Sequence, residues 1–132
     1  MRENLYRAKR KDDNKWIEGY FYKIWNKTFI LWGMTGDTPN MEEVIPETVE
    51  QYTGLKDENG KKIFEGDIIK PYIVGGAYDR FLFPNGAVVF EYGAFRIKDS
   101  RQSTPFSSYA PRVAFEVIGN IHDNPELLEK GE

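Results

Sequence analysis

Apolar and aromatic residues come in short runs separated by glycine, asparagine, aspartate or proline, which is the pattern of a β protein. The most aromatic run, Trp16 to Trp25, is apolar or aromatic at both alternating sets of positions. A strand of this kind is expected where one side packs on a core and the other meets a second layer or another subunit. Thr28 to Trp32 is predicted to return beside it after a short turn at Asn26-Lys27.

The segment from Gln51 to Lys70 predicts two strands joined by a tight turn. Asn59-Gly60 tolerates positive φ, and the apolar pair Ile63-Phe64 follows closely, so a hairpin is the natural interpretation. Glu65-Gly66-Asp67 then predicts a sharp change of direction into a further strand. Small β-barrels often begin in this way.

The remaining segments alternate between loops and strands. Two loops are predicted, Gly33 to Asn40 and Ser100 to Pro111, because both contain proline and several small polar residues. Pro46 to Val49 allows either an extended edge or one helical turn.

The last strand, Val113 to Ile118, is predicted to lead into a short helix. Asn124 is a candidate N-cap and Pro125 suits the first helical position. Leu127 and Leu128 would have to be buried, since so short a helix is not stable alone.

Three stretches resemble the YopX-like family of phage and prophage proteins. They are Tyr6 to Lys9 with Trp16 to Tyr20, Glu47 to Lys70, and Glu116 to Leu128. The resemblance covers nearly the whole chain and is weakest at about 33–41 and 73–83. It implies a mostly β protein with a complex small β-barrel and SH3-like elements, self-association, and no assigned enzymatic activity. The fold expected is therefore mainly β, with a short C-terminal helix.

The resemblance also implies one YopX-like domain over residues 1–132. Residues 1–50 would form an N-terminal β region, and residues 51–132 the barrel-like region and the C-terminal helix. The family motif makes Tyr52, Thr53, Glu65 and Asp67 recognition candidates. The segment Tyr52-Thr53-Gly54 would be either a surface epitope or a buried corner.

Composition narrows the class of protein. The 132 residues suit one ordinary domain, and the chain has no cysteine, so disulfides and thiolate metal sites are excluded. No segment reaches the roughly 20 apolar residues of a membrane-spanning helix. A soluble protein in the cytoplasm of the bacterial host cell, without membrane contact, is expected.

Charge is unevenly distributed. Residues 1–30 hold eight basic and four acidic residues, whereas residues 31–50 hold five acidic residues and no basic one. The whole chain carries a net charge of −3, which argues against a general phosphate-binding surface. Either both clusters are solvated faces, or they form the two sides of a head-to-tail contact between subunits.

Candidate chemistry is sparse. His122 is the single histidine, so a histidine metal cluster is excluded, and a packing role is the simpler interpretation. Asp57, Asn59 and Gly60 resemble the start of a calcium loop, but the spacing fails and the hairpin interpretation is preferred. No catalytic residue, metal site or cofactor is predicted.

Three classes of function remain open. The favoured one is a non-enzymatic, oligomeric phage or prophage accessory protein that binds an unidentified protein partner. The second is a single-stranded nucleic-acid-binding β-barrel. Its base-stacking side chains would be Trp16, Tyr20, Tyr22 and Trp25, and its phosphate-binding side chains Arg7, Lys9, Arg10, Lys15 and Lys23. The third is a carboxylate or Mg²⁺-dependent hydrolase that uses Glu65, Asp67 and Glu91.

Overall fold

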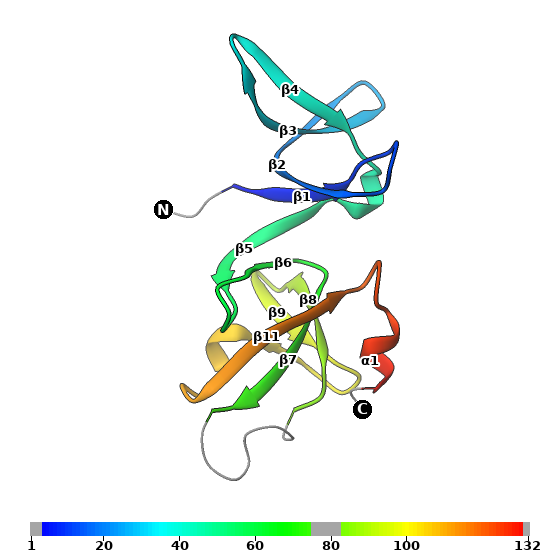
Figure 1. Cartoon of the computed structure of the whole chain (residues 1–132). Coiled ribbons are helices and arrows are strands. Elements are labelled where there is room, and N and C mark those ends of the chain that lie inside the picture. The colour runs from blue at the N-terminus through cyan, green and yellow to red at the C-terminus, as the bar shows by residue number, and fades with distance from the viewer. Residues whose placement is uncertain (1–3, 75–82, 131–132) are drawn as a thin grey trace. The chain divides into compact units, whose positions relative to one another are not determined.

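A computed structural model describes residues 4–74 and 83–130 of the chain (Figure 1). These residues are mainly β, in two antiparallel sheets with one very short C-terminal helix. The strand orders are β4-β3-β2-β1-β5-β6 and β10-β9-β8-β7-β11. The chain divides into two compact units, Met1–Gly54 and Leu55–Glu132. The prediction of a single domain therefore stays a prediction, and the boundary expected after residue 50 lies close to the division between the units.

The mainly β prediction is confirmed, but the predicted complex small β-barrel is wrong to the extent that the described residues form no closed barrel. Both sheets are open, with β4 and β6 at the edges of one and β10 and β11 at the edges of the other. Pro39 lies in edge strand β4 and Pro105 in edge strand β10. Proline has no N–H to donate to a further strand, so these edges are poor sites for the pairing that closure requires.

The first unit is built from hairpins. Its elements are β1 (Tyr6–Lys9), β2 (Trp16–Ile24), β3 (Lys27–Thr35), β4 (Thr38–Glu43), the 3₁₀ helix η1 (Pro46–Thr48) and the greater part of β5 (Glu50–Lys56). Ala8, Ile30 and Val44 form the buried core, and Ile17 and Val49 pack against it. The predicted strand at Trp16 is confirmed. Only one of its two faces contributes side chains to this core.

Two connections between strands differ from the sequence prediction. Ile24 pairs with Lys27, so the β2–β3 loop is Trp25-Asn26, not Asn26-Lys27. The predicted loop from Gly33 to Asn40 is wrong, because β3 continues to Thr35 and β4 begins at Thr38. Gly36 makes this possible, since its φ of +61° closes a two-residue turn.

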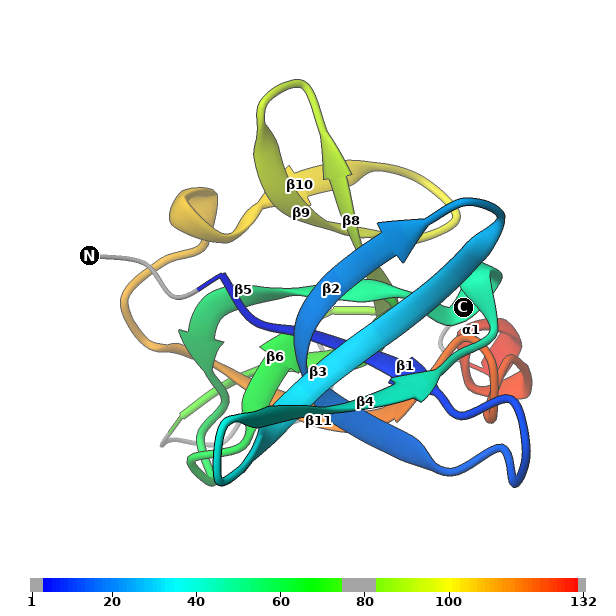
Figure 2. The same ribbon diagram turned by 90° about the horizontal axis from the view of Figure 1, so that it is seen from above.

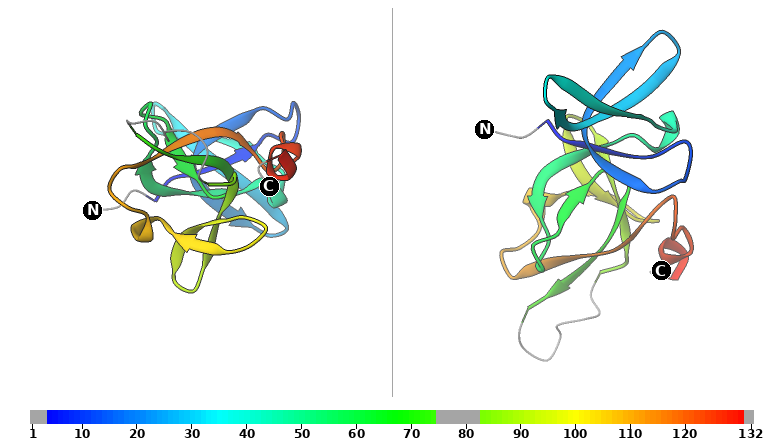
Figure 3. Two further views of the ribbon diagram at one scale, coloured as in Figure 1. Left: turned by 90° about the horizontal axis from the view of Figure 1, so that it is seen from below. Right: turned by 45° about the horizontal axis from the view of Figure 1, so that its top comes forward.

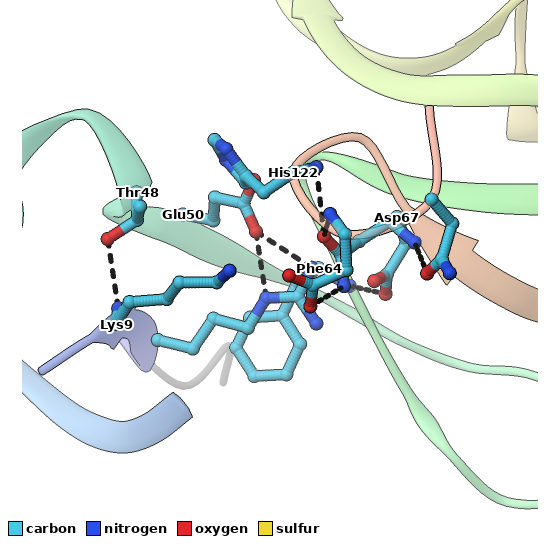
Figure 4. Close-up of polar contacts among 10 residues, drawn as sticks. Lys9, Thr48, Glu50, Phe64, Asp67 and His122 are labelled. Atoms are coloured by element: carbon cyan, nitrogen blue, oxygen red, sulfur yellow. Dashed lines mark hydrogen bonds and ion pairs between the residues drawn. The ribbon is translucent and has the colours of Figure 1, made fainter. Parts of the chain in front are cut away.

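Residues 46–48 take the helical alternative. Thr48 Oγ1 donates a hydrogen bond to the Ile45 carbonyl at 2.6 Å and accepts one from the Lys9 N–H at 2.9 Å. Figure 4 shows the second of these bonds. A single 3₁₀ turn is too short to be stable alone, and the Thr48 side chain holds η1 against β1.

The second unit holds the five-stranded sheet (Figure 3, left). Its elements are β6 (Lys62–Phe64), β7 (Asp67–Ile73), β8 (Gly86–Glu91), β9 (Ala94–Lys98), β10 (Ser103–Pro105), the 3₁₀ helix η2 (Phe106–Ser108), β11 (Val113–Asn120) and α1 (Glu126–Lys130). The buried cluster is Ile63, Ile69, Val88 and Ile97. The predicted loop from Ser100 to Pro111 is therefore only partly irregular, since it contains β10 and η2.

The Asp57 carboxylate closes the predicted Asn59-Gly60 turn and also binds a strand that is distant in sequence. Its Oδ1 accepts hydrogen bonds from the N–H groups of Asn59 and Lys61, at 2.9 and 2.8 Å. Its Oδ2 accepts a third, at 3.0 Å, from the N–H of Val117 in edge strand β11. One buried carboxylate therefore joins the hairpin turn to a strand distant in sequence.

Gly66 forms the predicted change of direction. Its φ is +89°, its N–H donates to the Val88 carbonyl at 2.8 Å, and its carbonyl accepts from the Ile121 N–H at 2.9 Å. Asp67 Oδ2 accepts from the Phe64 N–H at 2.8 Å and so braces the same corner (Figure 4).

We expect Gly66→Ala to lower the free energy of unfolding by about 1–2 kcal/mol, because an L-residue is strained in the left-handed region. Urea unfolding measures the change. Gly33→Ala, at a glycine without positive φ, is the matched control. An unchanged midpoint for Gly66→Ala would contradict the description of this corner.

Asn124, the predicted N-cap of α1, makes a different side-chain contact from the one expected. The Asn124 Oδ1 accepts from the Asn120 N–H at 3.2 Å, whereas the N–H of Leu127, the second residue of α1, donates to the Asn124 backbone carbonyl at 3.1 Å. The Asn120 side chain in turn accepts from the N–H groups of His122 and Asp123. The Asn124 side chain thus closes the turn instead of capping the helix, although a short helix does begin where expected.

Candidate contact surface

Side chains on β2, β3 and β4 alternate between the core and a second face. Phe21 pairs with Ile30 on the core side, and its ring lies 5.6 Å from that of Tyr6. Tyr20 and Tyr22 point to the other side, opposite Leu31 and Phe29. Because paired residues share a face, this outer side of the sheet carries a row of apolar and aromatic residues, with the charged residues Lys27 and Glu43 near one end.

Six exposed side chains make up what we call the aromatic face. Leu31 pairs with Met41 across β3 and β4, and Met34 pairs with Pro39, two residues before Met41 on the same side of β4. Trp32 occupies the bulge between these pairs. The members of the aromatic face are Tyr20, Tyr22, Trp25, Trp32, Met34 and Met41, each 40–86% exposed. Figure 2 shows the β2–β3 hairpin and β4 that carry them.

Trp25 is the most unusual member of this face. It is 86% exposed at the tip of the β2–β3 hairpin and has a φ of +54°. Glycine or asparagine is preferred at such a position, because a bulky side chain is strained there. Trp25 therefore presents a large apolar ring to water at a position where its backbone is strained.

We expect Trp25→Gly to raise the free energy of unfolding by about 0.5–1 kcal/mol. Relief of backbone strain outweighs the added flexibility of glycine in the unfolded chain. Chemical denaturation of both proteins at a concentration where the chain is monomeric measures the difference. A clear loss of stability would mean that the indole ring packs within the fold.

The basic side chains proposed for phosphate binding are mostly engaged within the unit. Arg7 forms an ion pair with Glu50 at 2.7 Å, and its guanidinium carbon lies 4.7 Å from the centre of the Trp16 ring. The Lys9 ammonium also lies over that ring, at 5.4 Å. Trp16 is half-buried, so it belongs to a cation–aromatic cluster instead of the exposed face.

Basic residues of the turn after β1 also form ion pairs with acidic residues. Arg10 contacts Asp13 at 2.8 Å, and Lys11 contacts Glu43 at 3.2 Å. The Lys15 N–H bond to Asp13 is the main cause of the lowered pKa of that carboxyl, and Arg10 adds to it. Of these pairs, Lys11–Glu43 joins the charged clusters at residues 1–30 and 31–50 within one chain, and the alternatives of solvated faces and a head-to-tail contact between subunits both stay predictions.

The motif residues lie inside the fold. Tyr52 and Thr53 are 4% and 5% exposed, which matches the buried-corner alternative. Asp67 is buried in the corner described above, and Glu65 is half-buried. These four residues serve packing and turn closure, and a partner would have little access to them.

The three carboxylates of the hydrolase hypothesis have structural neighbours. Asp67 accepts from Phe64, and Glu91 forms an ion pair with Lys98 at 3.1 Å. Within 4–74 and 83–130, no three acidic or histidine side chains are grouped as metal ligands. In the same ranges, no helix is long and apolar enough to cross a bilayer.

A concave apolar site lies in the second unit. It has a volume of about 430 Å³, and Leu55, Ile63, Phe106 and Phe115 line it together with Lys56 and Ser107. Sequence patterns did not reveal it, because η2 and β11 are brought together only by tertiary packing. The exposure of Met34 was also missed, since that residue was expected to lie in a loop.

Two open antiparallel sheets, one of them with an exposed aromatic hairpin surface, define a mainly β protein. The chain belongs to the YopX protein family, whose model matches residues 5–129. It is similar to the crystal structure of protein EF1440 from Enterococcus faecalis, with a TM-score of 0.60 and 26% identity. That similarity covers 97% of this chain and 99% of the other. No curated protein matches significantly.

Proposed function

We propose that this protein is a non-enzymatic, oligomeric protein-binding module of phage or prophage origin, acting in the cytoplasm of the bacterial host cell. The observation that carries the proposal is the aromatic face of β2, β3 and β4. Contiguous exposed apolar surface on a soluble protein marks an interaction site, and interfaces are enriched in tyrosine, tryptophan and methionine.

Protein is a better partner for this face than nucleic acid. A single-strand platform combines stacking rings with free cations that follow the phosphates. Here Arg7 and Arg10 are paired with carboxylates, and Lys23 alternates with Tyr22 and so points to the opposite face. Only Lys27, opposite Ile24, stands on the aromatic side among the bases of this hairpin.

We expect no salt-dependent change in tryptophan fluorescence when single-stranded oligonucleotides are titrated into the protein. The aromatic face offers too few unpaired cations to release the counterions that drive such binding. Strong quenching at low salt that weakens as salt rises would favour the nucleic-acid alternative instead.

A non-enzymatic role fits the carboxylates that a hydrolase would need. Of the three candidates, Glu65 is half-buried, Asp67 accepts a backbone N–H and Glu91 forms an ion pair with Lys98. A carboxylate that is committed to turns and ion pairs is a poor general base or metal ligand, because its lone pairs already have partners.

The proposal is tested by a photoreactive amino acid placed at position 20 in producing cells. The control position is 92, where Tyr92 is 87% exposed on a hairpin tip of the second unit. We expect protein adducts, to a second copy or to another protein, mainly from position 20. Equal or absent adducts from the two positions would overturn the proposal.

A further inference from the structure

The apolar cavity of the second unit has the size and composition of a small-molecule site. Its volume of about 430 Å³ lies within the range of roughly 300–1,000 Å³ that is usual for ligand pockets. Ile63, which is fully buried, lines it from the core, and the other apolar lining residues are Leu55, Phe106 and Phe115. An apolar pocket of this kind needs only one or two polar groups to orient its ligand.

The aromatic side chains of the cavity can receive a further ring. The ring centroids of Phe106 and Phe115 lie 5.1 Å apart with their planes at 69°. Tyr109 also packs edge-on against Phe115, at 5.2 Å and 86°. Aromatic rings prefer this arrangement because the positive edge of one ring meets the negative face of the next. A ring placed in the cavity would extend the same cluster.

The two polar residues of the cavity favour a negatively charged ligand. Lys56 supplies an ammonium group and Ser107 a hydroxyl, and none of the described residues that line the cavity is acidic. Lys56 is exposed and forms no ion pair with a described residue. The carboxylates next to it in sequence are engaged elsewhere, since Asp57 accepts backbone N–H groups and Glu58 accepts the Tyr72 hydroxyl.

A small molecule suits the cavity better than an extended peptide. A peptide that adds a strand to a sheet obtains much of its affinity from main-chain hydrogen bonds. The edge of β11 beside the cavity is already used, since the Phe115 carbonyl accepts the Glu58 N–H at 2.9 Å. The Val117 N–H on that edge donates to Asp57. Edge strand β10 ends in Pro105, which has no N–H to donate.

We propose that this cavity binds a small carboxylic acid that carries an aromatic ring. The ring packs against Phe106 and Phe115, and the carboxylate meets the Lys56 ammonium and the Ser107 hydroxyl. Most of the affinity comes from the apolar lining, because an ion pair with an exposed lysine contributes little in water. The site lies in the second unit and does not depend on the function proposed for the aromatic face.

Methyl NMR spectroscopy of the full-length chain tests the inference, with 4-phenylbutyrate as the probe. We expect the methyl signals of Ile63 and Leu55 to shift on titration, with a dissociation constant below about 1 mM. Lys56→Met should weaken binding of 4-phenylbutyrate about threefold to fivefold and leave binding of the uncharged 4-phenylbutanol unchanged. Lys23→Met, at an exposed lysine of the first unit, is the control and should affect neither probe.

Leu55→Glu tests the apolar lining and the charge together. It should weaken binding of 4-phenylbutyrate at least about tenfold, because it removes apolar contact and adds a like charge. Leu55 is 44% exposed, so this variant and Lys56→Met are expected to keep the urea midpoint of the wild type.

Three results would overturn the inference. They are methyl signals that do not shift with millimolar probe, an equal loss of both probes in Lys56→Met, and the same effect from Lys56→Met and Lys23→Met. If the probe does not bind and a photoreactive amino acid at position 55 gives protein adducts in producing cells, the cavity is a protein contact and the inference also fails.

Discussion

Replacing Asp57 with alanine is expected to lower the free energy of unfolding by about 3 kcal/mol. The substitution removes the acceptor of three backbone N–H groups, those of Asn59, Lys61 and Val117. Loss of a charged acceptor leaves buried donors unsatisfied, and the Val117 N–H lies in a half-buried edge strand. Urea unfolding of both proteins measures the difference.

Asp99→Ala is the matched control. The Asp99 Oδ1 also accepts two N–H bonds, from Arg101 and Gln102, but both lie within its own exposed turn. Water can replace that acceptor, so a loss of about 1 kcal/mol or less is expected. Equal losses in the two variants would show that the bond from Asp57 to β11 contributes nothing.

The contribution of Asp57 should depend on pH. Burial raises the pKa of this carboxyl, but the N–H groups of Val117, Lys61 and Asn59 outweigh it, so the pKa lies below its ordinary value. A lowered folded-state pKa stabilises the fold above the unfolded-state pKa and loses that effect as pH falls through the folded value. The stability difference between wild type and Asp57→Asn should therefore shrink below about pH 4.

Gly19→Ala is the second large effect, with an expected loss of about 3 kcal/mol or more. A Cβ atom at Gly19 would lie 2.0 Å from the Leu31 carbonyl oxygen and 2.8 Å from Ile30 Cγ2. The carbonyl belongs to the β3 backbone, so it cannot move aside without disturbing the β2–β3 pairing, and overpacking of this kind is destabilising.

The control for Gly19 lies in the same sheet. A Cβ at Gly33 would meet nothing closer than Asn40 Nδ2 at 3.8 Å, so Gly33→Ala should change stability by only about 0.5 kcal/mol. Differential scanning calorimetry of the two variants gives the comparison. Similar melting temperatures would mean that the close approach at Gly19 is not part of the folded protein.

Local patterns were sufficient for most strands. The aromatic run from Trp16 and the turn at Asn59-Gly60 were predicted because alternation and turn chemistry act over a few neighbouring residues. The β3–β4 turn was missed, since Gly36-Asp37 beside Pro39 resembles an ordinary loop, and the sequence does not show that Pro39 lies on a tolerant edge.

Long-range features were beyond the sequence patterns. The third bond of Asp57 reaches Val117, and whether a sheet closes depends on which distant strands pair, so the predicted barrel was wrong. The candidate surface was partly foreseen in Tyr20, Tyr22 and Trp25. The sequence did not distinguish Trp16 from these exposed residues, because its burial depends on Arg7 and Lys9 in the neighbouring strand.

We expect the aromatic face to be covered by protein in the cell. Oxidative footprinting tests it by comparing side-chain oxidation in producing cells with that in dilute purified protein. We expect protection of Tyr20, Tyr22 and Trp25 in cells, while Tyr92 reacts equally in both settings. Equal oxidation of all four residues in the two settings would contradict the account.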